Sequence, residues 1–347
     1  MTEFLPTFMC LAVLSIATSV KSSGAETGGR PAAAETFRVR ISSTGLSVLV
    51  RHQAPTHGGG GNGKSPVLFV HGSSFPSALA FAYKFDDGVS WMDDLANRGF
   101  DVWAFDFLGY GGSDRYPEMN DSATANPPLG RAPVAAAQIA AVVDFIRSRT
   151  KAQRTSIIAH SWGTVPAGLF AGQHPEAIDR LVDFGPVAQR SGSRRDAPLP
   201  AYDFVSEKDQ LTRFDGYVPR GEAHVLAEPG LPRWGPAYMS TDASSRSRNP
   251  ASVKIPNGPS ADITDAWSGR LPYDPSLITA PVLIIRGDWD VVTKDADANW
   301  LWNALQRAPI KRDVKISRAT HVMHLETNRA ALFDEVGTFL SAPLPGR

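Results

Sequence analysis

The most informative stretch of this chain is Ser156-Ile157-Ile158-Ala159-His160-Ser161-Trp162-Gly163-Thr164. An apolar run typical of a buried strand ends at Ser161, and a helical pattern begins directly after it. Ala159 and Gly163 are small, as a tight strand-to-helix turn of the nucleophile-elbow type requires, because larger side chains would collide with the strained backbone. A serine that caps an ordinary helix gives a similar pattern. The interpretation therefore depends on the rest of the chain.

Other apolar runs alternate with helical patterns on both sides of the elbow. We expect an antiparallel hairpin over 37–52, because two alternating runs flank Thr44-Gly45. Continuous apolar runs predict strands buried on both faces of a sheet. Strands are expected at 66–70, 101–105, 156–160, 180–184, 281–285 and 313–317, and helices at 132–149, 164–174, 294–306 and 328–340. Alternation of this kind predicts a mostly parallel α/β sheet with helices on both faces, built from residues 37–186 and 281–342.

Residues 187–280 interrupt this rhythm. The segment is rich in proline and also carries many aromatic residues, among them Phe214, Tyr217, Trp234 and Tyr238. It is too long for a plain loop, and a disordered linker would hold fewer aromatic residues. We therefore expect a lid or cap insertion here. Such a lid suggests an organic substrate with sizeable apolar parts.

The N-terminal residues have the composition of an export signal. The apolar run Leu5–Val20 has the length of a secretory h-region and is too short for a stable membrane span. We expect a signal peptide over 1–25, a flexible leader over 26–36, and a secreted or periplasmic protein. An uncleaved apolar arm is the alternative, since residues 1–4 carry no Lys or Arg. Cys10 is the only cysteine and lies inside this run, so a mature chain would form no disulfide and no thiolate metal site.

The charge balance excludes some partner classes. The chain has 35 basic and 35 acidic residues, with 42% hydrophobic residues. A neutral globular chain of this kind does not indicate nucleic acid or an anionic membrane surface as a main partner. Nothing in the sequence specifies an oligomeric state.

Three polar residues each follow the carboxyl end of an expected parallel strand: Ser161, Asp290 and His321. Open α/β sheets bind ligands at this edge. A serine hydroxyl needs a base within hydrogen-bond reach to act as a nucleophile, and a histidine titrates in the range that suits this base. A carboxylate fixes the histidine tautomer and stabilises the imidazolium. The three residue types therefore point to acyl-transfer chemistry.

At this point the chain resembles the α/β-hydrolase superfamily. The resemblance rests on five motifs: His71-Gly72, Asp106…Gly109…Gly111…Ser113, the serine elbow, Gly287-x-x-Asp290, and His321-x-x-His324-x-Glu326. It implies a mostly parallel sheet of roughly eight strands. It also implies that Ser161 is the nucleophile, His321 the base and Asp290 the acid.

Several neighbouring residues compete for these roles. Asp288 and Asp183 are rival acids, and His324 is a rival base. His160 is expected to pack under the elbow. Asp106 is expected to tie loops together as a structural carboxylate.

The resemblance also implies an oxyanion hole made from two backbone amides. One belongs to Trp162, which follows the nucleophile, and the other to Ser73, which follows His71-Gly72. Ser74 could take the place of Ser73, since the segment after His71-Gly72 is longer than in compact relatives. Fixed amides suit developing negative charge because they need no reorganisation. The mechanism needs no metal or other cofactor.

A serine at the elbow argues against relatives that open epoxides or displace halide, which use aspartate there. We expect a serine hydrolase that cleaves a carboxylic ester, lactone or thioester of a small organic molecule through an acyl-enzyme. The alternatives on the same residues are an acyltransferase, a hydrolase of carbon–carbon bonds, a cofactor-free haloperoxidase, or a low-turnover ligand-binding relative.

Overall fold

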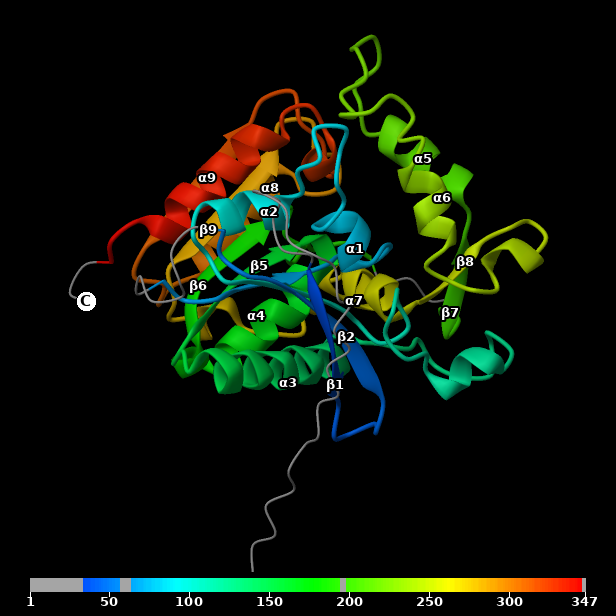
Figure 1. Cartoon of the computed structure of the whole chain (residues 1–347), viewed down its shortest axis with the longest axis horizontal. Helices are drawn as coiled ribbons and strands as arrows, with labels where there is room; N and C mark the ends of the chain where they lie inside the picture. The colour runs from blue at the N-terminus through cyan, green and yellow to red at the C-terminus, as the bar shows by residue number, and fades with distance from the viewer. Residues whose placement is uncertain (1–33, 57–63, 194–197, 345–347) are drawn as a thin grey trace, which may run out of the picture.

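A computed structural model describes residues 34–56, 64–193 and 198–344 of the chain (Figure 1). The expected signal peptide at 1–25 and most of the leader at 26–36 lie outside these residues. Within the described ranges, no helix combines the length and apolar character needed to cross a membrane.

An eight-stranded, mostly parallel sheet forms the centre of the protein, as predicted. Its strand order is β1-β2-β4-β3-β5-β6-β9-β10. The pairs β1–β2 and β2–β4 are antiparallel, and the other neighbours are parallel. The strands are β1 (Glu35–Arg40), β2 (Ser47–Gln53), β3 (Val67–Val70), β4 (Val102–Asp106), β5 (Thr155–His160), β6 (Ile178–Phe184), β9 (Val282–Gly287) and β10 (Lys311–Ile316).

The first strand begins two residues earlier than the hairpin pattern predicted. Glu35 and Thr36, placed at the end of the expected leader, pair with His52 and Arg51 of β2. A carboxylate oxygen of Glu35 lies 3.5 Å from Nδ1 of His52. Cross-strand contacts of this kind extend β1 beyond its apolar residues.

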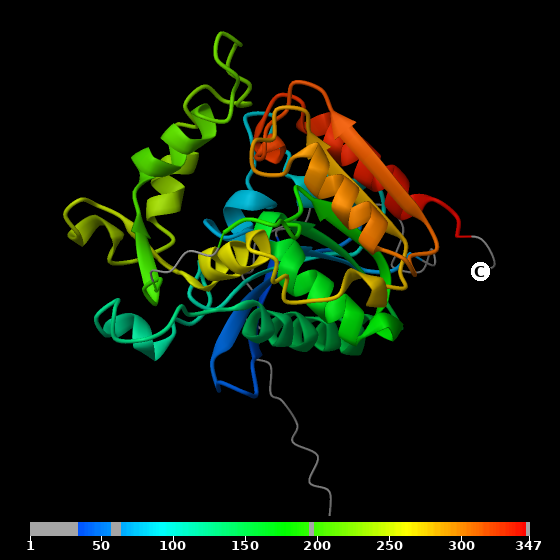
Figure 2. The same ribbon diagram turned by 180° about the vertical axis from the view of Figure 1, so that it is seen from behind.

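Helices cover both faces of the sheet (Figures 1 and 2). On one face, Trp91 of α2 stacks on Phe333 of α9 with ring centroids 4.8 Å apart. The other face is covered by α3 and α4, which pack along one another. The main helices are α1 (Ser77–Ala80), α2 (Trp91–Asn97), α3 (Ala132–Thr150), α4 (Thr164–Gln173), α8 (Asp295–Ala304) and α9 (Arg329–Ser341). The sheet edge that carries Ser161 is thereby set in a rigid frame.

The stretch between β6 and β9, residues 187–280, is called the insertion segment below, and the structure describes it at 187–193 and 198–280. It contains an antiparallel pair, β7 (Tyr202–Val205) and β8 (Val253–Pro256). Its helices are α5 (Glu207–Asp215), α6 (Trp234–Met239) and α7 (Gly258–Trp267). Figures 1 and 2 show α5, α6 and the β7–β8 pair to one side of the main sheet, with α7 closer to it.

The aromatic residues of the insertion segment mostly pack on one another. The indole of Trp234 lies 5.3 Å from the ring of Phe214 and 5.4 Å from that of Tyr238, measured between centroids. All three side chains are buried. Phe75 of the main body joins them, with its ring 5.9 Å from that of Phe214 and 5.2 Å from that of Trp234. The number of aromatic residues therefore reflects packing within the segment and against the main body, and does not by itself indicate a large apolar substrate.

Many hydrogen bonds attach the insertion segment to the main body, and two sets of them reach the elbow and the loop that carries His321. Asp262 of α7 is fully buried and accepts bonds from the indole Nε1 of Trp162 at 3.0 Å and from the amide of Ala132 at 2.7 Å. The amide of Ala227 donates to the carbonyl of Leu325 at 2.9 Å. The amide of Thr327 donates to the carbonyl of Val225 at 2.8 Å. The segment is thus bonded both to the elbow and to the loop that carries His321.

The turn from β5 into α4 lies directly against the end of β3. A Cβ atom at Gly163 would come within 2.4 Å of the carbonyl oxygen of His71 and 2.9 Å of that of Val70. These are backbone atoms, which cannot rotate away. Glycine is therefore required at this position by close approach.

We predict that Gly163→Ala lowers the free energy of unfolding by about 1–3 kcal/mol, the usual cost of overpacking. Gly172→Ala is the matched control in α4, the helix that follows Gly163, because its Cβ would meet Leu277 Cβ at an ordinary 3.4 Å. That change should be neutral or stabilising by up to about 1 kcal/mol, since alanine favours helix. Urea denaturation of both variants measures the difference. Equal stability of the two would contradict the close contact at residue 163.

Candidate active site

Ser161 sits at a strained point of the backbone. It follows β5 and opens a short 3₁₀ turn, Ser161–Gly163, that leads into α4. Its φ of 56° lies in the left-handed region, which few residues other than glycine adopt. Such a conformation costs of order 1–3 kcal/mol and persists only where the surrounding structure imposes it. The turn presents the Ser161 side chain to a cavity at the sheet edge.

The structure brings Ser161, His321 and Asp290 into one hydrogen-bonded chain. The Oγ atom of Ser161 lies 2.8 Å from Nε2 of His321. The Nδ1 atom of the same imidazole lies 2.8 Å from Oδ2 of Asp290. All three side chains are buried, so water competes weakly for these bonds.

Backbone amides orient the carboxylate of Asp290. Its Oδ1 accepts bonds from the amides of Val292 and Thr293, both at 2.8 Å. Oδ2 is therefore the oxygen that faces His321. Because a carboxylate only accepts, Nδ1 of His321 carries the proton in this bond and Nε2 can accept from the Ser161 hydroxyl. This tautomer is the one that a general base requires.

The two rival acids lie elsewhere. Asp288 is exposed, and its nearest hydrogen-bond partners are Ser317 Oγ and the amide of Ala319, both at 3.4 Å. Asp183 is buried in β6, and neither of its oxygens has a hydrogen-bond partner. Burial raises the pKa of Asp183 to about 8, so this carboxyl group is mostly protonated at neutral pH. Neither residue is bonded to His321.

Gly185 was not singled out from the sequence, although it borders the His321–Asp290 pair. Its φ is +56°. A Cβ atom here would lie 3.0 Å from Nδ1 of His321 and 3.3 Å from Oδ2 of Asp290. The only signal in the sequence is a glycine directly after a strand, which many turns share.

The other two histidines at this edge are neutral. The Nε2–H of His160 donates to the carbonyl of His321 at 2.9 Å. Burial, followed by the nearby His324, His321 and Arg213, holds the pKa of His160 well below its ordinary value. Burial also lowers the pKa of His324 to about 3, and neither of its ring nitrogens has a hydrogen-bond partner. His160 thus bonds the backbone carbonyl of His321 and lines the cavity, while His324 fills a space among aromatic rings.

The loop after β3 is held close to Ser161. His71 accepts a bond from the amide of Phe107 at Nε2 and donates from Nδ1 to the carbonyl of Gly72, at 3.0 and 2.7 Å. Burial lowers the pKa of His71 to about 4, which keeps this arrangement neutral. A Cβ atom at Gly72 would lie 3.1 Å from that of Ser161. Glycine therefore allows the backbone before Ser73 to approach the elbow.

Asp106 ties the neighbouring loops together, in agreement with the structural role expected for it. It is fully buried, and its Oδ1 accepts from both the amide and the hydroxyl of Ser77. Its Oδ2 accepts from the amide of Gly112 at 3.0 Å. These bonds join the α1 turn to the loop after β4.

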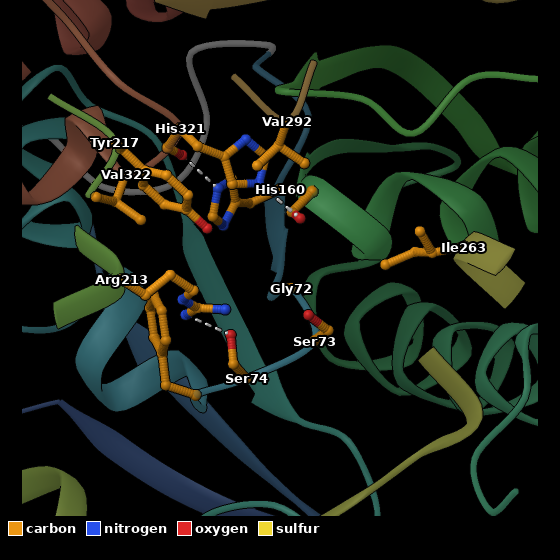
Figure 3. A pocket seen from close by; sticks show the side chains of 12 residues that line it. Gly72, Ser73, Ser74, His160, Arg213, Tyr217, Ile263, Val292, His321 and Val322 are labelled. Atoms are coloured by element: carbon orange, nitrogen blue, oxygen red, sulfur yellow. Dashed lines mark hydrogen bonds between the residues drawn. The ribbon is translucent and has the colours of Figure 1, made fainter. Parts of the chain in front are cut away.

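A cavity of about 130 Å³ opens in front of Ser161 (Figure 3). Of the two residues expected to supply amide donors, Ser73 is among the lining residues and Trp162 is not. Trp162 lies in the first turn of a 3₁₀ helix, where amides have no partner within the helix. The lining residues are Gly72, Ser73, Ser74, Phe75, His160, Ser161, Arg213, Tyr217, Ile263, Val292, His321 and Val322.

Two lining residues come from α5 and the turn after it in the insertion segment, and the sequence did not single them out for the site. Arg213 and Tyr217 project into the cavity from the side opposite Ile263 (Figure 3). Their place depends on how a proline-rich segment folds, for which the sequence has no periodic signal.

Within the described ranges, no group of three or more His, Cys, Asp or Glu side chains could hold a metal ion.

Comparisons with known proteins agree with this fold. The family model of the α/β hydrolase fold matches residues 57–327. None of the curated proteins matches the sequence. Among solved structures, an esterase from Exiguobacterium antarcticum is similar with a TM-score of 0.59 and 16% identity, over 88% of this chain and 99% of that one.

Two further solved structures resemble the chain to the same degree. A bromoperoxidase from Bacillus anthracis has a TM-score of 0.58 and 15% identity, over 88% of this chain and 99% of that one. A 2-hydroxy-6-oxo-6-phenylhexa-2,4-dienoate hydrolase from Rhodococcus sp. strain RHA1 has a TM-score of 0.56 and 18% identity, with the same coverage. At such identities the likeness shows the fold alone.

We predict that Asp183→Asn stabilises the protein more at pH 8 than at pH 5. Between the ordinary pKa of 3.8 and the folded-state value of about 8, the unfolded chain releases this proton while the folded chain keeps it. The free energy of unfolding therefore falls as pH rises through that window. Asparagine does not titrate and removes this loss.

Urea denaturation at the two pH values measures the effect. Asp288→Asn is the control, because that side chain is exposed. A stability difference between wild type and Asp183→Asn that stayed constant from pH 5 to pH 8 would show that Asp183 does not titrate in this way.

Proposed function

The chain belongs to the α/β hydrolase family, and on this premise we propose that it is a serine hydrolase that cleaves carboxylic esters through an acyl-enzyme. One observation carries the proposal. The Ser161 hydroxyl, the His321 imidazole and the Asp290 carboxylate form one chain of two 2.8 Å bonds, at a cavity that can admit a substrate.

In the first half of the proposed reaction, Oγ of Ser161 attacks the ester carbonyl carbon while its proton moves to Nε2 of His321. Asp290 stabilises the imidazolium through Nδ1. The carbonyl oxygen becomes an oxyanion, and the amides of Ser73 and Trp162 are proposed to donate to it. His321 then returns the proton to the alkoxy oxygen as the carbon–oxygen bond breaks, and the alcohol leaves.

The second half repeats these steps with water. His321 takes a proton from water, and the resulting hydroxide attacks the acyl carbon. Breakdown of the second tetrahedral intermediate returns the proton to Oγ of Ser161 and releases the acid. The reaction consumes one ester and one water and forms one acid and one alcohol.

We also propose that α5 acts as the expected lid over the site. Arg213 and Tyr217 of this part of the insertion segment line the cavity opposite the catalytic edge. The cavity volume of about 130 Å³ is below the roughly 300–1,000 Å³ typical of small-molecule pockets. The proposed substrate therefore has a short acyl group, unlike the sizeable apolar substrate suggested by the aromatic residues of the segment.

Ser161→Ala should lower kcat for p-nitrophenyl butyrate by at least about 10⁴-fold, because the nucleophile is lost. Circular dichroism and thermal unfolding should remain near wild type. The matched control is Ser148→Ala on the exposed side of α3, which should keep full activity. A fluorophosphonate probe should label wild type and not Ser161→Ala. Turnover by Ser161→Ala near the wild-type rate would refute the proposal.

Asp290→Asn should lower kcat by about 10³–10⁴-fold, because an amide no longer selects the tautomer of His321 that accepts from Ser161. Asp183→Asn should leave kcat near wild type, since Asp183 makes no bond to His321. Steady-state kinetics on the same ester compares the two variants. A larger loss of kcat in Asp183→Asn than in Asp290→Asn would show that Asp183 is the acid of the triad instead of Asp290.

A further inference from the structure

Arg213 introduces a positive charge into the cavity that contains Ser161. The other ionisable side chains that line the cavity are His160, His321 and Tyr217. No Asp or Glu lines it. Figure 3 shows the guanidinium below the His160 and His321 imidazoles and close to Ser74. The proposed ester chemistry does not require a cation at this position.

The guanidinium is anchored but not neutralised. Its Nη2 donates to Oγ of Ser74 at 2.9 Å and to Oε1 of Gln210. Gln210 in turn donates from Nε2 to the carbonyl of Ser74 at 3.1 Å. Among the described residues, no carboxylate lies within ion-pair distance of Arg213, and its buried Nε has no acceptor. An arginine has five N–H donors, so most of its capacity is unused.

Several other partly buried arginines of this protein are paired with carboxylates, whereas Arg115 donates to the backbone carbonyls of Gly109, Lys254 and Thr241. Arg131 pairs with Asp262 and Asp265, Arg190 pairs with Asp297, and Arg286 pairs with Asp295 and Asp313. Pairing is expected, because a guanidinium stays protonated and a desolvated charge without a partner is costly. Arg213 has neither a carboxylate partner nor an acceptor for its buried Nε, and it lines a cavity in which a ligand could supply the missing anion.

We propose that Arg213 binds a carboxylate on the acyl part of the substrate, so that the natural substrates are half-esters of short dicarboxylic acids. This inference rests on the proposed ester hydrolysis. A planar guanidinium matches a carboxylate in shape and charge. We place the carboxylate on the acyl part because this part remains on Ser161 after the alcohol leaves. Arg213 can then hold it through both steps of the reaction. Because the cavity is small, only a short carbon chain fits between the ester carbonyl carbon and the carboxylate carbon of the substrate.

The test compares monomethyl succinate with methyl 4-methylpentanoate, in which an isopropyl group replaces the carboxylate. Wild type should prefer the acidic ester. Arg213→Gln should lower kcat/KM for monomethyl succinate by about 10–100-fold, the range for a lost charged hydrogen bond. The same variant should change kcat/KM for the neutral ester by less than about 3-fold, because that ester makes no such bond. Arg213→Lys should fall between, since it keeps the charge but not the planar fork.

Arg220→Gln is the matched control, because it removes the same charge from an exposed residue in the turn that follows α5. It should leave both substrates unaffected. If wild type hydrolyses the neutral ester as well as the acidic one, and Arg213→Gln leaves their ratio unchanged, the carboxylate inference is overturned while the proposed function stands.

A binding measurement tests the role of Arg213 without depending on turnover. Calorimetric titration of Ser161→Ala with monomethyl succinate should show binding that Ser161→Ala/Arg213→Gln loses by at least about 10-fold. If neither ester is hydrolysed by wild type, the proposed function fails, and this titration still decides the role of Arg213. Absence of binding to Ser161→Ala, or equal binding to both variants, would overturn the inference.

Discussion

The whole site depends on one steric constraint, the contact of the β5–α4 turn with the end of β3. Gly163 leaves room for the carbonyl of His71, and Gly72 leaves room for Ser161. With these two side chains absent, the strained backbone of Ser161 lies directly beside the loop that carries Ser73. The energy of a well-packed parallel sheet offsets the local strain. Larger side chains at either glycine would separate the hydroxyl from the proposed amide donor at Ser73.

Desolvation determines the protonation states around this turn. His71, His160 and His324 are buried, and burial is the main reason that their pKa values are lowered. They therefore remain neutral at neutral pH. His71 and His160 hold backbone groups of the site through hydrogen bonds. His321 has different partners, since its Nδ1 is bonded to the carboxylate of Asp290 and its Nε2 to the hydroxyl of Ser161. One sheet edge thus holds three buried imidazoles bound by packing or backbone groups and a fourth that is bonded to two side chains.

The sequence was most informative where regular strands meet polar residues. The order of apolar runs predicted the mostly parallel sheet, and their carboxyl ends indicated Ser161, Asp290 and His321 as neighbours. It was least informative within the insertion segment, where aromatic residues such as Trp234 serve local packing. Arg213 could not be found from the sequence, because its position depends on the tertiary contacts of α5. Gly185 carried only the signal of an ordinary turn, although it borders the His321–Asp290 pair.

The backbone bonds between residues 225–227 and 325–327 have a consequence for how such a protein can diverge. They join the insertion segment to the stretch just after His321, so the two are parts of one interwoven surface. A transplanted segment would keep this attachment only if its backbone met residues 325–327 in the same way. To preserve these bonds, recombination has to exchange two stretches of chain about a hundred residues apart in a single step. The insertion segment is therefore poorly suited to exchange as a single piece.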